Sequence, residues 1–110
     1  MSPRFLDPGI LNRRALLEIN EPVADELGGA ADAWREVAEV SVRLEPVSVE
    51  TAERFGQRMA NAQHRVTLRH RADVDRGMAF RIGPRRFLVR SLQDPDETGR
   101  FLVCRCEAET

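Results

Sequence analysis

The sequence has no lysine and no tyrosine, only two cysteines, and no long apolar run. The two cysteines, Cys104 and Cys106, stand too close together to form the disulfide framework of a small secreted domain. No stretch approaches the roughly 18 apolar residues of a membrane-spanning helix, and the N-terminal segment lacks the apolar core of a signal peptide. We therefore expect synthesis in a reducing, cytoplasmic compartment and no membrane partner.

Motifs of catalysis and cofactor binding are also missing. The sequence has neither a glycine-rich phosphate loop nor a nucleophile elbow. His64 and His70 lie on one predicted strand, where six residues span roughly 20 Å, too far for both to bind one metal ion. The sequence therefore predicts no enzyme activity, no metal and no cofactor. It predicts that Cys104 and Cys106 are small core residues.

What the chain does have is alternation of apolar and polar residues with a period of two, which is typical of half-buried strands. Its 110 residues are the length of a single domain, residues 1–110. Residues 1–12, with Pro3, Pro8 and Gly9, are expected to form an irregular arm. Six strands are predicted, over residues 14–20, 34–46, 64–70, 78–82, 86–92 and 101–107. The expected fold class is mainly β, as a small antiparallel barrel or sandwich.

One segment, residues 47–63, has a different period and predicts a helix inserted between the second and third strands. Ser48 is a suitable N-cap, and Glu50 would lie favourably in the first turn. Apolar residues recur at steps of three and four, at Ala52, Phe55, Met59 and Ala62. Gly56 weakens such a helix by about 1 kcal/mol relative to alanine, so its stability would depend on packing.

The charges are unevenly distributed, although the net charge is only -1. Residues 18–53 contain ten acids and two arginines, and residues 64–90 contain eight arginines and two aspartates. Two arrangements satisfy this asymmetry: the sections pair within one fold, or copies of the chain bind each other head to tail. All 17 cationic residues are arginines, which form bidentate contacts with carboxylates and suit interfaces.

The arginine-rich strands allow an alternative interpretation as a nucleic-acid-binding barrel. Arg65, Arg69 and Arg71 would share an outward face, and Arg85 and Arg86 would follow the next turn. Single-strand binding also needs exposed aromatic side chains for stacking. Here the aromatics lie mostly at apolar-face positions, which favours core packing.

The order of elements resembles the phage head–tail joining proteins, also called head-completion or stopper connectors, which occur in phages, prophages and gene transfer agents. The features that carry the resemblance span residues 11–108. They are the first strand LNRRALLEI, the glycine-bearing DELGGAADAWREVAEV, the strand VSVRLEP before a serine, and the C-terminal half HRVTLRHRADVDRGMAFRIGPRRFLVRSLQDPDETGRFLVCRCEA. The sequence departs from the family pattern by an extra residue after Gly83 and in the length and alanine content of the predicted helix.

The resemblance implies a structural connector that forms a ring, expected to be a hexamer, between the head and the tail of a phage-type particle. It implies partners above (portal or adaptor ring) and below (tail terminator or tail tube), and double-stranded DNA passing through the channel. The subunit would be made in the bacterial cytoplasm and assembled at the head–tail junction. The ring would retain packaged DNA and dock the tail.

Two groups of residues are then candidates for function. The insertion is the expected gate of the channel, with candidate residues Ser48, Glu50, Arg54, Arg58 and Gln63. The contact between neighbouring subunits is expected to pair acids with arginines, with candidate residues Glu36, Glu39, Glu45, Arg65 and Arg69.

Overall fold

The structure, a computed structural model, describes residues 10–47, 52–54, 57–59 and 63–109. Six strands form a closed antiparallel barrel in the order β1-β4-β7-β10-β9-β8. Their bounds are β1 (Arg13–Asn20), β4 (Trp34–Pro46), β7 (Gln63–Arg69), β8 (Ala79–Ile82), β9 (Arg85–Gln93) and β10 (Phe101–Ala108). This confirms the mainly β class and the six strands expected from the alternation.

The barrel closes because β1 pairs with β4 along one edge and with β8 along the other. Closure leaves none of the six strands with a free edge. Two register shifts help the strands to bend. One lies between Leu17 and Glu18, where Val37 becomes the extra residue on β4, and the other lies between Arg105 and Cys106 on β10.

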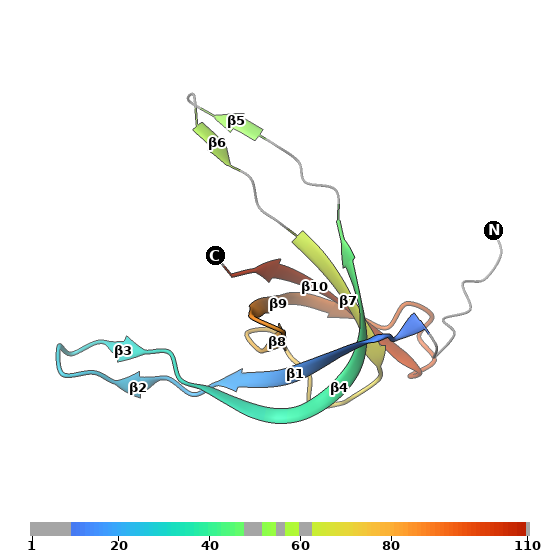
Figure 1. The fold of residues 1–110 in the computed structure, drawn as a ribbon, viewed down its shortest axis with the longest axis horizontal. Coiled ribbons are helices and arrows are strands. Elements are labelled where there is room, and N and C mark those ends of the chain that lie inside the picture. Colours follow the sequence, from blue (N-terminus) through green and yellow to red (C-terminus); the bar gives the residue numbers. More distant parts are fainter. Residues whose placement is uncertain (1–9, 48–51, 55–56, 60–62, 110) are drawn as a thin grey trace.

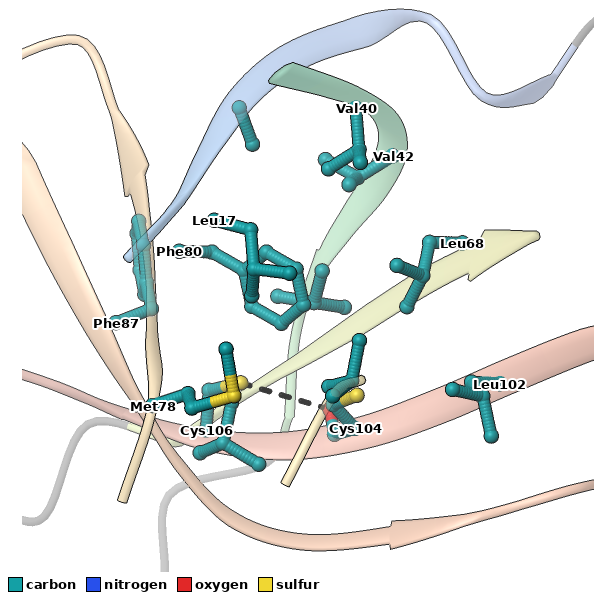
Figure 2. Close-up of a cluster of buried hydrophobic side chains, with 14 of the residues drawn as sticks. Leu17, Val40, Val42, Leu68, Met78, Phe80, Phe87, Leu102, Cys104 and Cys106 are labelled. Atoms are coloured by element: carbon teal, nitrogen blue, oxygen red, sulfur yellow. Dashed lines mark hydrogen bonds between the residues drawn. The ribbon is translucent and has the colours of Figure 1, made fainter. Parts of the chain in front are cut away.

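The core fills the barrel interior with the residues that the alternation assigns to the inward face (Figure 2). Phe80 and Phe87 are its largest members, and both are completely buried. All barrel strands contribute, with Leu17, Val42, Leu68 and Cys104 among the buried residues. Alternation along β7 places Thr67 on the outward face, opposite to Val66 and Leu68, yet Thr67 is buried, flanked in register by Arg43 and Val103.

The predicted helix over residues 47–63 is wrong for the part of this insertion that the structure describes. Two short antiparallel strands are present instead, β5 (Ala52–Arg54) and β6 (Gln57–Met59), with Arg54 opposite Gln57. The physical reason is visible in the sequence. An isolated helix of this length is marginal, Gly56 would weaken it further, and the insertion joins two paired strands, β4 and β7, which bring its two ends together. Ser48 and Glu50 lie outside the described residues.

A second pair of short strands, β2 (Val23–Ala24) and β3 (Ala30–Ala31), lies in the connection between β1 and β4. Both pairs project from the barrel as narrow arms (Figure 1). The radius of gyration is 15.9 Å, against roughly 13 Å for a compact domain of about 100 residues. We call residues 21–33 the β2–β3 ribbon and residues 47–63 the insertion.

Residues 1–9 of the predicted arm lie outside the described residues, and Leu11 is buried against the barrel rather than solvent-exposed. No helix in the described part of the chain is long and apolar enough to cross a membrane.

Candidate functional surfaces

The base of the insertion is held by the barrel itself. The backbone N–H of Val47 donates to the carbonyl of Gln63 at 2.9 Å, one step beyond the Pro46–His64 pair of the β4–β7 ladder. The Gln63 side chain is exposed at this base, and its Oε1 accepts from Arg105 at 3.2 Å. Of the gate candidates, Gln63 therefore lies where the insertion leaves the barrel.

Arg54 and Arg58 lie within the insertion, on β5 and β6 respectively. In the register of this pair, Arg58 stands opposite Glu53 and Arg54 opposite Gln57. The insertion therefore places two arginine positions on an arm that projects beyond the barrel (Figure 1).

The acidic and basic sections of the sequence meet inside one subunit, along the β4–β7 pair. Glu45 of β4 stands directly opposite Arg65 of β7, and it also forms an ion pair with Arg43 at 3.2 Å. The two sections therefore lie side by side at Glu45, and the first arrangement allowed by the charge asymmetry, pairing within the fold, is seen as an ion pair between Glu18 and Arg86. The side chains of Glu45, Arg43 and Arg65 are partly exposed, so each pair among them contributes at most about 1 kcal/mol.

The other interface candidates are not brought together within the subunit. β4 pairs with β7 from Val42 to Pro46, whereas Glu36 and Glu39 lie in the part of β4 that pairs with β1. Glu39 accepts from Arg14 of β1 at 3.1 Å. Arg69 is exposed at the other end of β7, opposite Phe101. Glu36 and Arg69 both face solvent on different parts of the barrel wall.

A polar cluster that the alternation does not predict ties three barrel strands together at one end. Glu18 is buried, and it accepts from Arg86 Nε at 3.1 Å. The same guanidinium donates to Glu109 at 3.2 Å and lies 4.8 Å from the centre of the Trp34 ring. The only sequence signal for this cluster was the placement of Arg86 beside a tight turn.

The two cysteines lie in the core, and His64 packs against a core aromatic ring. Among the described residues, no three metal-ligating side chains gather in one place. Burial raises the pKa of the Cys104 thiol to about 12 and also raises that of Cys106, which disfavours the thiolate form of both side chains. They lie in the core (Figure 2). His64 stands opposite Cys106 and packs edge-on against Phe87, with ring centres 4.8 Å apart.

The aromatic side chains of the described residues give no platform for stacking bases. Phe80, Phe87 and Phe101 are buried, and the Trp34 ring is covered by Arg86. In the described part of the chain, the basic strands are not accompanied by fully exposed aromatic side chains of the kind on which bases stack. The described structure is a packed barrel with two projecting arms and a charged wall.

Comparison with known proteins agrees with this architecture. A family model described as "Phage head completion protein" matches residues 6–109. A chain from a structure of the virion of a native gene transfer agent particle is 25% identical, with 99% of this chain and 98% of that chain covered and a TM-score of 0.69. The protein SF1141 from Shigella flexneri 2a is 19% identical, with 93% and 96% covered and a TM-score of 0.63, and shares the fold. No curated protein matches.

The chain belongs to the phage head completion protein family, because the family model covers nearly its whole length. It is a structural component of a phage-like particle, and the resemblance drawn from the order of its elements is confirmed.

Proposed function

We propose that this chain is the subunit of a connector ring between the portal or adaptor and the tail, and that the ring retains packaged DNA and docks the tail. The observation that carries the proposal is the end-to-end match with a chain of a gene transfer agent virion. A sixfold ring is the arrangement we expect. Portal-side and tail-side proteins would contact its two faces.

The insertion is the proposed gate of this ring. It is carried on the β4–β7 pair, and its base is fixed by the Val47–Gln63 hydrogen bond. An arm fixed at its base and free of the barrel at its far end is suited to reach into a channel (Figure 1). Arg54 and Arg58, together with Ser48, Glu50 and Gln63, are the residues we propose to meet DNA or the next ring, since arginine binds phosphate bidentately.

The lateral contacts of the ring are proposed to pair Glu36, Glu39 and Glu45 of one subunit with Arg65 and Arg69 of its neighbour. Glu36 and Arg69 carry most of this proposal, because they lie on separate parts of the barrel wall. Glu39 and Glu45 already form ion pairs within the same subunit, so an arginine of the neighbour would bind a carboxylate that already has one arginine partner. Exposed pairs of this kind set the register of a contact more than its affinity.

Deletion of residues 51–62 in the producing cell tests the gate. We expect particles that still carry the ring at the head–tail junction, seen by electron microscopy, but that lose their packaged DNA, measured by nuclease sensitivity. A control variant replaces residues 51–62 with a glycine–serine linker of the same length, which keeps the chain length and removes the arginines. Full retention of DNA in both variants contradicts the gate, and absence of any ring of this chain in wild-type particles contradicts the connector.

A further inference from the structure

The β2–β3 ribbon ends in an exposed apolar side chain on a preorganised tip. Leu27 is 95% exposed, the most exposed large apolar side chain described, and Val23 on the same ribbon is 56% exposed. The ribbon thus presents two exposed apolar side chains on a projecting arm, and a docking partner would remove both from water.

The tip holds Leu27 in a fixed position. Asp25 accepts from the backbone N–H groups of Leu27 and Gly29 at 3.0 and 2.8 Å, and its own N–H donates to the carbonyl of Gly29. Gly28 has a φ of +81°, which glycine adopts without strain. A tip ordered before binding loses little conformational entropy when it docks.

The root of the ribbon is equally well fixed. Glu21 N–H donates to the carbonyl of Ala33 at 2.8 Å, and Asn20 bonds both Asp32 and the Ala33 N–H. Glu21 also pairs with Arg35. A lone two-stranded hairpin is marginally stable in water. These hydrogen bonds connect the ribbon to the β1–β4 pair and so stabilise it as a continuation of that pair.

The ribbon is also strongly acidic. Residues 21–33 contain four acids and no arginine, and Glu26 lies exposed beside Leu27 at the tip. Its docking site should therefore offer a partly exposed apolar side chain beside exposed arginine.

Such a site is present on the barrel of the same chain. A shallow depression of about 330 Å³ is lined by Arg14, Ala15, Leu16, Glu39, Arg81 and Gly83. Arg81 is exposed and also borders a second depression, lined with Pro84, Arg86 and Glu109. Arg14 and Arg86 already bind carboxylates. Among the ion pairs of the described residues Arg81 takes part in none, so its charge is available to a partner.

The ribbon of one subunit is too distant to occupy its own depression. Arg81 stands opposite Leu16 on β1, and Leu27 follows eleven positions further along an extended chain that leads away from the barrel (Figure 1). At about 3.3 Å per residue the separation is about 35 Å. An occupant of this depression therefore comes from another molecule.

We propose that the β2–β3 ribbon docks on the neighbouring copy of this chain, with Leu27 over the half-buried Leu16 side chain and Glu26 beside Arg81. A projection on one part of the surface and its receptor on another make a head-to-tail contact, which closes into a ring when the rotation permits. The proposal rests on the connector ring proposed above and names a lateral contact of that ring.

Photo-crosslinking in assembled particles tests this contact. With p-benzoylphenylalanine at position 27, we expect a covalent dimer of this chain whose joined peptides, identified by mass spectrometry, pair the ribbon with β1 or β8. The same label at Glu97, an exposed residue of the loop before β10, serves as control and should not give that product. A crosslink from position 27 to a different particle protein, or none at all, overturns the proposal.

A charge exchange supplies a second readout that does not depend on the label. Glu26→Arg should lower the yield of the dimer about five-fold, the effect of losing one exposed ion pair, and Arg81→Glu in the same chain should restore it. Failure of the double variant to recover contradicts the Glu26–Arg81 contact. Rings at the junction without the crosslink would contradict only the ribbon contact and would agree with the proposed connector. Particles without rings of this chain would contradict the proposed connector itself.

Discussion

At the scale of single residues, Arg86 has the largest structural role of any charged side chain described. It joins β1 through Glu18, the C-terminal residues through Glu109 and β4 through the Trp34 ring. Glu18 is almost completely buried, and a buried carboxylate is tolerated only when it is paired. Arg86 therefore makes a polar residue possible where the β1 register shifts.

Replacement of Arg86 by methionine, which keeps the apolar stem, tests this role. We expect a loss of about 2–3 kcal/mol in the free energy of unfolding, somewhat below the cost of breaking a fully buried pair because Arg86 is partly exposed. Urea denaturation measures it. Glu109→Gln removes the more exposed partner and should cost less than about 1 kcal/mol; equal losses in the two variants would contradict the role of burial.

His64 makes the stability of the barrel sensitive to mild acid. Burial, and then the nearby charge of Arg85, lowers the pKa of His64 below its ordinary value of 6.5. The folded state thus binds the proton more weakly than the unfolded chain does, so stability is complete above about pH 6.5 and falls as the pH drops toward the folded pKa.

We expect His64→Leu to reduce the loss of stability between about pH 7 and pH 5.5, measured by urea denaturation at each pH. His70, the other histidine, is exposed, and His70→Gln should retain the full wild-type dependence. An unchanged dependence in His64→Leu would show that another group titrates in this range.

At the scale of elements, the insertion is an appendage of the barrel. The Val47–Gln63 hydrogen bond already closes the β4–β7 ladder at the root of the insertion, and the core residues whose burial the structure describes lie in other parts of the chain. Replacement of residues 48–62 by a two-residue asparagine–glycine turn should therefore change the melting temperature by only a few degrees. Asparagine–glycine is suited to a two-residue hairpin turn. Loss of cooperative unfolding would show that the insertion is part of the core structure.

The elements differ in how far the sequence determines them. Strand alternation predicted the six barrel strands because a half-buried strand must place its apolar residues on one face, as at Val40 and Val42. The helix predicted for the insertion is wrong because the apolar spacing at Ala52 and Met59 also fits a helix. In the structure these two positions pair across a hairpin, and that pairing depends on the strands on either side of the insertion. Burial of Glu18 also escaped prediction, since it depends on Arg86, distant in the sequence.

At the scale of the whole molecule, the charge asymmetry has two uses. Part of it is satisfied within the subunit, where β4 and β7 lie side by side and Glu45 faces Arg65. The acidic ribbon is different, because it leads away from the barrel, and no arginine lies among its own residues. Glu21 at its root pairs with Arg35, whereas the charge of Glu26 at its exposed tip is available to the neighbouring molecules of an assembly.

Arg69 provides the test of the lateral pairing on the barrel wall. It is exposed at the end of β7, so Arg69→Glu should leave the melting temperature within about 1–2 °C of wild type, because exposed substitutions change stability little. In the ring it would meet the acids of β4 on the neighbour, and like charges there repel. We expect fewer particles with attached tails, counted by electron microscopy, and partial recovery at high salt, which screens the repulsion.

Arg76→Glu is the matched control, since Arg76 is also exposed but lies in the turn before β8, and it should assemble normally. If Arg69→Glu assembled as well as Arg76→Glu, the acids of β4 would have no arginine partner at this position, and the ribbon would be left as the proposed lateral contact.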